Sequence, residues 1–216
     1  MDALIQTIAV YALPVLFGIT LHEAAHGYVA RMFGDPTAWQ AGRISLNPIR
    51  HIDPVGTIVV PLVLLFSTKL LGGGGLLFGW AKPVPVDWGR LRHPKRDMLW
   101  VALAGPASNL VMAIIWALSL RLLAEAGASH DDFWVQMTIA GIQVNLILMA
   151  LNLVPLPPLD GGRIVFSLLP SRMAWQFSRI EPYGLLILII LMLTGILWIV
   201  LGPILAFGQL IVNWFL

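Results

Sequence analysis

The chain has 216 residues, of which 58% are hydrophobic and only 11% are charged. Soluble domains carry roughly 25% charged residues, so this balance excludes an ordinary soluble domain and indicates an integral membrane protein. The formal net charge of +2 is too small to favour nucleic acid as a partner. The chain contains no cysteine, which excludes disulfides and thiolate ligands, so a metal site would have to use histidine and carboxylate side chains.

The first apolar stretch, Ala3–Met32, is long enough to cross a membrane as a helix and carries an unusual polar cluster. Up to its last two residues, its only acidic, basic or imidazole side chains are those of His22, Glu23 and His26. An ionisable side chain near the middle of a bilayer costs roughly 2.5–3.5 kcal/mol. Three of them in one helix therefore indicate a functional site.

The spacing of these three residues, His-Glu-x-x-His, is typical of a metal-binding helix. Residues four apart lie on one face of a helix, so His22 and His26 can reach the same metal ion while Glu23 points beside it. The alternative is that the three side chains only form hydrogen bonds between helices. Such bonds gain about 0.6 kcal/mol on average in membranes, which explains three buried ionisable groups poorly.

Three segments of less regular character follow. Arg43–Leu46 alternates in polarity, and Lys82–Val86 contains two prolines, which push the preceding residues to extended geometry. We expect small strands or a hairpin in both segments, because unpaired extended backbone is costly in lipid. Val55–Trp80 is apolar, but a proline, polar residues and four consecutive glycines interrupt it. It is either a re-entrant or interfacial segment or a kinked crossing.

Three further stretches are long and apolar enough to span a membrane as helices: Met98–Leu123, Phe133–Val154 and Tyr183–Val200. The tail Leu201–Leu216 is also apolar. We expect the dipeptide Gly202-Pro203 to kink or break this tail and to leave about one half-span, because proline removes a backbone hydrogen bond inside a helix.

Asp160 is the best further ligand, since it follows the third long stretch closely while the two histidines lie late in the first. For the three side chains to meet, the first and third long helices must run parallel, which requires an odd number of crossings between them. Met98–Leu123 then crosses the membrane and Val55–Trp80 does not. The alternative for Asp160 is a turn or a helix cap before Gly161 and Gly162.

The distribution of basic residues agrees with this topology. It places nine Lys and Arg residues between Arg31 and Arg96 and three between Arg163 and Arg179 on one side, and only Arg121 opposite. Basic residues collect on the cytoplasmic side of membrane proteins, so the site should lie near the cytoplasmic face. We therefore expect an all-α polytopic membrane protein with about four transmembrane helices, a re-entrant or interfacial segment and short β-strands near the cytoplasmic side.

The motifs described above resemble those of the site-2 protease family of intramembrane zinc metalloproteases, peptidase family M50. His22–His26 is similar to the family's first motif, and Asn152–Gly162, with an asparagine, prolines and then Leu-Asp-Gly-Gly, is similar to its second. Ala104–Asn109 is similar to the helix between them, so the likeness spans about residues 15–165.

The resemblance implies a metalloendopeptidase with one Zn²⁺ per chain, bound by His22, His26 and Asp160, and with Glu23 as the catalytic base. Three protein ligands leave a position for water, whose pKa zinc lowers to about 7, and Glu23 would take its proton and return it to the leaving amine. The resemblance also implies that Asn152 contacts the substrate. The alternative for Asn152 is a structural hydrogen bond at the proline-rich bend.

The implied substrate is a transmembrane protein, cut within or near its membrane segment. A helical substrate must unwind before cleavage, and our hypothesis is that Arg43–Leu46 or Lys82–Val86 pairs with the unwound strand. Membrane lipids are the other expected partner, and nucleic acid is not one. A chain this compact favours a prokaryotic cell membrane.

We expect a single membrane-embedded domain over residues 1–216, with a catalytic core at about 3–165 and a C-terminal apolar helical segment at about 183–216. Many members of the family carry an appended PDZ or CBS domain, and this sequence leaves no room for one. Regulation by such domains is then absent or is supplied by a regulatory membrane partner.

Two alternatives belong to other functional classes. A membrane zinc carrier would need ligands at several depths, whereas the ionisable residues here cluster at one level. An inactive zinc-stabilised scaffold would leave Glu23 without a role.

Several other polar residues receive simpler interpretations. For Asn109 and Asn145 we favour helix–helix hydrogen bonds over catalysis, and Gly105 indicates a close helix contact. The remaining histidines lie alone outside the long apolar stretches and are expected to be solvated or interfacial; they are His51, His93 and His130.

Overall fold

The computed structural model describes residues 2–51, 53–59 and 82–216, and the regular elements in these ranges are all helical. Four helical stretches are long and apolar enough to span a membrane: Ile5–Met32, Pro94–Glu125, Phe133–Asn152 and Ser171–Leu193. The prediction of an all-α protein with about four membrane-spanning helices is therefore confirmed for the described part of the chain. The elements in chain order are α1 (Asp2–Met32), α2 (Thr37–Gln40), η1 (Pro48–His51), η2 (Pro54–Val59), η3 (Trp88–Arg90), α4 (Pro94–Glu125), α5 (Phe133–Asn152), α6 (Asp160–Leu168), α7 (Ser171–Ser178), η4 (Glu181–Tyr183), α8 (Gly184–Leu193) and α9 (Ile196–Val212).

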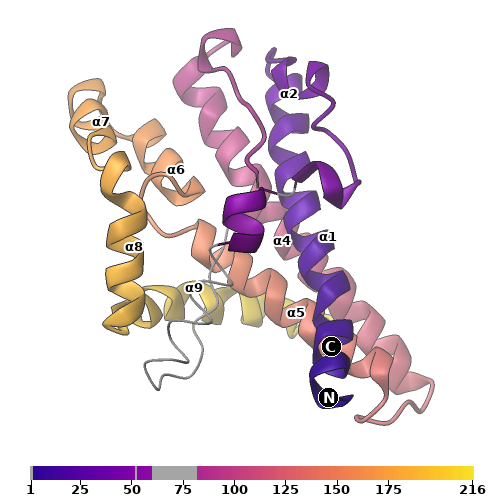
Figure 1. The fold of residues 1–216 in the computed structure, drawn as a ribbon. Coiled ribbons are helices and arrows are strands. Elements are labelled where there is room, and N and C mark those ends of the chain that lie inside the picture. Colours follow the sequence, from indigo (N-terminus) through magenta and orange to yellow (C-terminus); the bar gives the residue numbers. More distant parts are fainter. Residues whose placement is uncertain (1, 52, 60–81) are drawn as a thin grey trace.

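Helices α1, α4 and α5 pack against one another and form the centre of the fold (Figure 1). Between α1 and α4, rising residue numbers on one helix meet falling numbers on the other. His22 of α1 lies beside Asn109 of α4, and His26 lies beside Val101. The two helices are therefore antiparallel, as two successive membrane crossings require.

Helix α5 runs in the same direction as α1. Tyr11 of α1 donates to Gln143 of α5, and Gly18 approaches Leu148 further along each helix. One crossing, α4, separates the two helices in the described chain. The predicted parallel arrangement is thus confirmed, and it brings the end of α5, and Asp160 shortly after it, to the level of the histidines.

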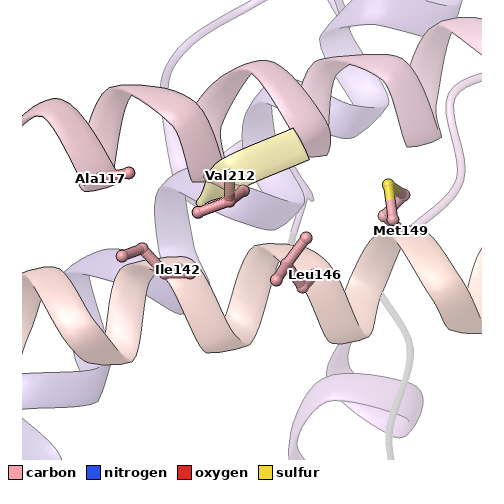
Figure 2. Close-up of a cluster of buried hydrophobic side chains, with 6 residues drawn as sticks. Ala117, Ile142, Leu146, Met149 and Val212 are labelled. Atoms are coloured by element: carbon pink, nitrogen blue, oxygen red, sulfur yellow. The ribbon is translucent and has the colours of Figure 1, made fainter. Parts of the chain in front are cut away.

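A cluster of buried apolar side chains holds α4, α5 and the end of α9 together (Figure 2). Helix α4 contributes only alanines, whereas the other two helices contribute larger side chains; the members are Ala113, Ala117, Ile142, Leu146, Met149 and Val212. In the same interface, a Cβ on Gly141 would overlap the indole ring of Trp116. Small residues let helices in membranes approach closely, so these alanines and this glycine set the spacing of α4 and α5.

The C-terminal apolar stretch breaks at a different place from the one predicted. Gly195, with φ of 76°, ends α8 and begins a turn into α9, which crosses the molecule at a steep angle to α8 (Figure 1). Gly202 and Pro203, the predicted breakpoint, lie inside α9. The left-handed conformation at Gly195 suits a residue without a Cβ and turns the chain sharply. A proline inside a helix removes only one hydrogen bond, so α9 continues through Pro203.

The predicted β-strands are wrong for the residues described. Arg43–Leu46 and Lys82–Val86 both adopt irregular backbone, and the described ranges contain no strand. The physical reason is that side chains, rather than a neighbouring strand, form hydrogen bonds with the backbone of these segments. The guanidinium of Arg43 donates to the carbonyl oxygen of Lys82 at 2.7 Å, and the two prolines of the second segment have no N–H to offer.

Most of Val55–Trp80 lies outside the described residues, so its predicted re-entrant course stays a prediction. The described part begins within η2, a single π-helical turn.

Candidate metal centre

Three buried side chains converge on one point where α1 meets the start of α6. The Nε2 atoms of His22 and His26 are 3.1 Å apart, and Oδ2 of Asp160 lies 3.1 Å from the first and 3.2 Å from the second. All three residues are less than 7% exposed. Ligand atoms around one tetrahedral zinc ion lie about 3.3 Å apart, because each sits roughly 2.0–2.2 Å from the metal. The spacing of the three atoms therefore suits a single zinc ion.

The hydrogen bonds at Nδ1 of His22 and His26 determine that each Nε2 carries a lone pair towards Asp160. Nδ1 of His26 lies 2.7 Å from the carbonyl oxygen of Val101, which can only accept, so Nδ1 carries the hydrogen. Nδ1 of His22 makes a similar contact of 2.7 Å with Oδ1 of Asn109. Both Nε2 atoms then point their lone pairs at the carboxylate of Asp160, whose Oδ2 is buried and accepts no hydrogen bond from the described residues. Three electron-pair donors facing one another fit a bound cation.

Asp160 reaches this position because the chain after α5 folds tightly onto itself. It is the first residue of α6, and a Cβ on Gly161 or on Gly162 would collide with the backbone of residues 153–157. The predicted alternative of a helix cap has no support, since the cap of α6 involves no side-chain hydrogen bond.

Gly105 of α4 closes one side of the centre. A Cβ at this position would lie 2.5 Å from Cε1 of His22 and 2.6 Å from Nε2 of the same ring, and it would collide with His26 as well. The close contact predicted from the sequence is therefore with the imidazoles themselves. The sequence signal was only a small residue in the segment Ala104–Asn109.

Glu23 lies half-buried on α1 beside the two histidines, and its Oε2 accepts a hydrogen bond of 2.7 Å from the N–H of Val84. Val84 belongs to the irregular 82–87 segment, which crosses α1 here; a Cβ on Gly27 would lie 3.1 Å from its Cγ1. A second carboxylate holds the far end of the segment, since Oδ2 of Asp35 accepts from the N–H of Asp87 at 2.7 Å. No pattern in the sequence predicted the contact between Val84 and Glu23.

The amide of Asn152 bonds within its own helix and not to His22, His26 or Asp160. It is the last residue of α5, and its Nδ2 donates to the carbonyl oxygen of Leu148 at 3.0 Å, one turn earlier in the same helix. Its predicted contact with the substrate stays a prediction.

The remaining histidines lie away from the centre. His51 is only 2% exposed, and its Nε2 lies 3.0 Å from the carbonyl oxygen of Ser45, so the expectation that it is solvated or interfacial is wrong. His93 and His130 are exposed, as expected.

Comparison with known proteins gives the same chemistry. The family model described as "Peptidase family M50" matches residues 120–195. "Putative zinc metalloprotease YwhC" of Bacillus subtilis is 38% identical over 203 residues, which cover 90% of this chain and 85% of that protein. "Putative zinc metalloprotease Rip2" of Mycolicibacterium smegmatis is 29% identical over 83% of this chain and 64% of its own length.

An archaeal relative, "Putative zinc metalloprotease MJ0611" of Methanocaldococcus jannaschii, is 28% identical over 68% of this chain and 64% of its own length. No solved structure matches the chain. From the extent of the likeness to the Bacillus subtilis protein and from the family match, the chain belongs to peptidase family M50, the site-2 protease family, and is a zinc-dependent metalloendopeptidase of the membrane.

Proposed function

We propose that the protein hydrolyses peptide bonds within or near the transmembrane segments of other membrane proteins. In this proposal His22, His26 and Asp160 hold one zinc ion per chain and Glu23 is the catalytic base. The observation that carries the proposal is the convergence of three buried ligand atoms, 3.1–3.2 Å apart, inside a bundle of membrane-spanning helices. A site at this depth suits a substrate that is itself embedded in the membrane.

A zinc ion held by His22, His26 and Asp160 would supply a water of lowered pKa and would polarise the carbonyl group of the substrate. The protein's residues do the rest. Val101 and Asn109 hold the imidazoles with their Nε2 lone pairs inward, and Gly105 leaves room for both rings. Glu23 takes the proton of the attacking water and returns it to the leaving amine.

The hydrogen bond from Val84 determines which oxygen of Glu23 handles the proton. It engages one lone pair of Oε2 and restrains the plane of the carboxylate, and in this proposal Oε1 is the oxygen that receives the proton and later delivers it. Asn152 is the proposed substrate contact, and to act as a donor its amide would have to exchange the carbonyl of Leu148 for the substrate.

The proposed setting is a prokaryotic cell membrane with the site near the cytoplasmic face and residues 1–216 acting as one domain. The supporting observation is that the basic residues collect on the side of the membrane where α1 and α5 end. A regulatory membrane partner is part of the same proposal. The alternative of a zinc carrier gains no support, because a search of the described residues for grouped metal ligands finds His22, His26 and Asp160 at one level only.

The test is to replace Glu23 with glutamine and measure two quantities: zinc bound per chain and the rate of cleavage of a model transmembrane substrate in detergent or liposomes. We expect zinc to be retained and cleavage to fall by about 10²–10⁴-fold, because glutamine cannot accept the proton. Glu125→Gln is the matched control, since Glu125 lies exposed at the end of α4 and pairs with Arg121. Cleavage at the unmodified rate in Glu23→Gln would sink the proposal.

A further inference from the structure

Two asparagines are buried completely between the three central helices. Asn109 of α4 and Asn145 of α5 both have 0% exposure. Burying a polar amide in an apolar setting costs free energy unless its donors and acceptors are paired. Both side chains are amply paired, and together their hydrogen bonds join α1, α4 and α5.

The pairing fixes the orientation of the Asn109 amide. Its Nδ2 donates one hydrogen to the carbonyl oxygen of Gly18 at 3.0 Å and the other to Oδ1 of Asn145 at 3.1 Å. A flipped amide would turn Oδ1 towards the carbonyl of Gly18, and two acceptors would then face each other. The oxygen of Asn109 must therefore face His22.

Asn145 is oriented in the same way. Its Nδ2 donates to the carbonyl oxygen of Gly141 at 2.8 Å, one turn earlier in α5, so its Oδ1 is the atom that faces Asn109. Each side chain therefore donates to the next. Nδ1 of His22 donates to Oδ1 of Asn109 at 2.7 Å, Asn109 donates to Asn145, and Asn145 donates to the carbonyl oxygen of Gly141.

The two histidines of the centre differ in what holds them. The partner of His26 is the backbone carbonyl of Val101, which every residue type at that position would supply. The partner of His22 is a side chain, so its orientation depends on Asn109. A neutral amide also adds no charge, whereas a carboxylate in this place would add a negative charge to those of Asp160 and Glu23.

We propose that Asn109 is a positioning residue for the metal centre: it holds His22 in the tautomer and orientation that direct Nε2 at the zinc, and Asn145 orients Asn109. This inference rests on the proposed function, in which His22 is a zinc ligand. Partners of this kind raise metal affinity, and their loss costs about 10–100-fold in many metal sites.

The test measures zinc affinity and, separately, the melting temperature of the zinc-free protein for the purified full-length chain. We expect Asn109→Leu to weaken zinc binding by about 10–100-fold and Asn145→Ala to weaken it in the same direction by less. Thr138→Val is the matched control, because Thr138 is a buried polar residue of α5 whose hydroxyl donates to the carbonyl of Val135 in its own helix. Its zinc affinity should be unchanged.

Purely structural asparagines would give another result. The melting temperature of the zinc-free protein would fall while zinc affinity stayed within about twofold of the unmodified protein, and this would overturn the inference. If Asn109→Leu does not fold, Asn145→Ala decides, because it removes one of the two acceptors that orient Asn109 and leaves Asn109 in place. His22→Ala separates the two proposals: tight zinc binding in that variant rejects the ligand assignment itself, whereas lost zinc there with normal zinc in the asparagine variants rejects only the positioning role.

Discussion

Among single residues, Gly105 places the strictest steric demand on the metal centre. Gly105→Ala adds a methyl group 2.6 Å from Nε2 of His22, where only a displacement of the ring can relieve the contact. Overpacking of this kind costs about 1–3 kcal/mol, which exceeds the roughly 1 kcal/mol that alanine gains over glycine inside a helix. We expect zinc affinity, measured by titration with a competing chelator, to fall about tenfold or more.

Gly202→Ala is the control for this substitution. Gly202 is also a helical glycine, and no described atom lies within 4 Å of the Cβ that it would gain. Zinc affinity should be unchanged in this variant. If Gly105→Ala also bound zinc normally, the imidazoles would have room to move and the centre would be less tightly enclosed than the contacts imply.

The sequence predicted the individual residues of the centre unevenly, for a physical reason. His22 and His26 follow from helical periodicity, and Asp160 was chosen as the best remaining ligand because it follows the third long stretch closely; the number of crossings was then inferred from that choice. The partner of His22 did not follow, since Asn109 lies 87 residues away on another helix and its side chain could equally have bonded to Asn145 alone. Spacing along one helix is local information, whereas contacts between helices depend on their rotation and depth.

At the scale of elements, the 82–87 segment controls the orientation of Glu23 through one backbone N–H, that of Val84. Val84→Pro removes this hydrogen. Val84 already precedes a proline and is restricted to extended geometry, so the backbone can accept the substitution. We expect zinc to be retained and the rate of substrate cleavage to fall by about 10-fold or more, because the carboxylate loses a charge-assisted hydrogen bond of roughly 1.5–3 kcal/mol.

Val84→Ala keeps the N–H and removes most of the side chain that packs near Gly27. It therefore measures the packing contribution alone. Equal cleavage rates in the two variants would show that the hydrogen bond to Glu23 has no part in the reaction.

Element types were predicted well where periodicity and length agree, and less well where the backbone bonds to side chains. The first three apolar stretches each became one long helix, because intrahelical hydrogen bonds satisfy the backbone without outside partners, whereas the fourth divides into α8 and α9. The 82–87 segment failed as a strand because Arg43, Glu23 and Asp35 bond to its backbone instead. The C-terminal break fell at Gly195 because the sequence offers two helix-breaking sites and tertiary packing chooses between them.

In the molecule as a whole, the arrangement of helices fixes which loops share a side of the membrane. Helices α4 and α5 form an antiparallel pair, and the loop that joins them lies at the opposite end from α6 and α7 (Figure 1). The basic residues follow the same division, since only Arg121, near the C-terminal end of α4, lies on the side of the joining loop. If the cytoplasmic side is the basic one, α6 and α7 face the cytoplasm and the joining loop faces outward.

Single cysteines test this orientation cleanly, because the chain contains none of its own. Ser129 lies exposed in the loop between α4 and α5, and Ser171 lies exposed at the start of α7. In spheroplasts, a membrane-impermeant maleimide should label Ser129→Cys at once and Ser171→Cys only after permeabilisation. The reverse pattern would place the metal centre towards the outer face. Labelling of both cysteines from outside would mean that α5 does not cross the membrane. That result would reject the topology in which α1, α4 and α5 are three successive crossings that bring Asp160 to His22 and His26.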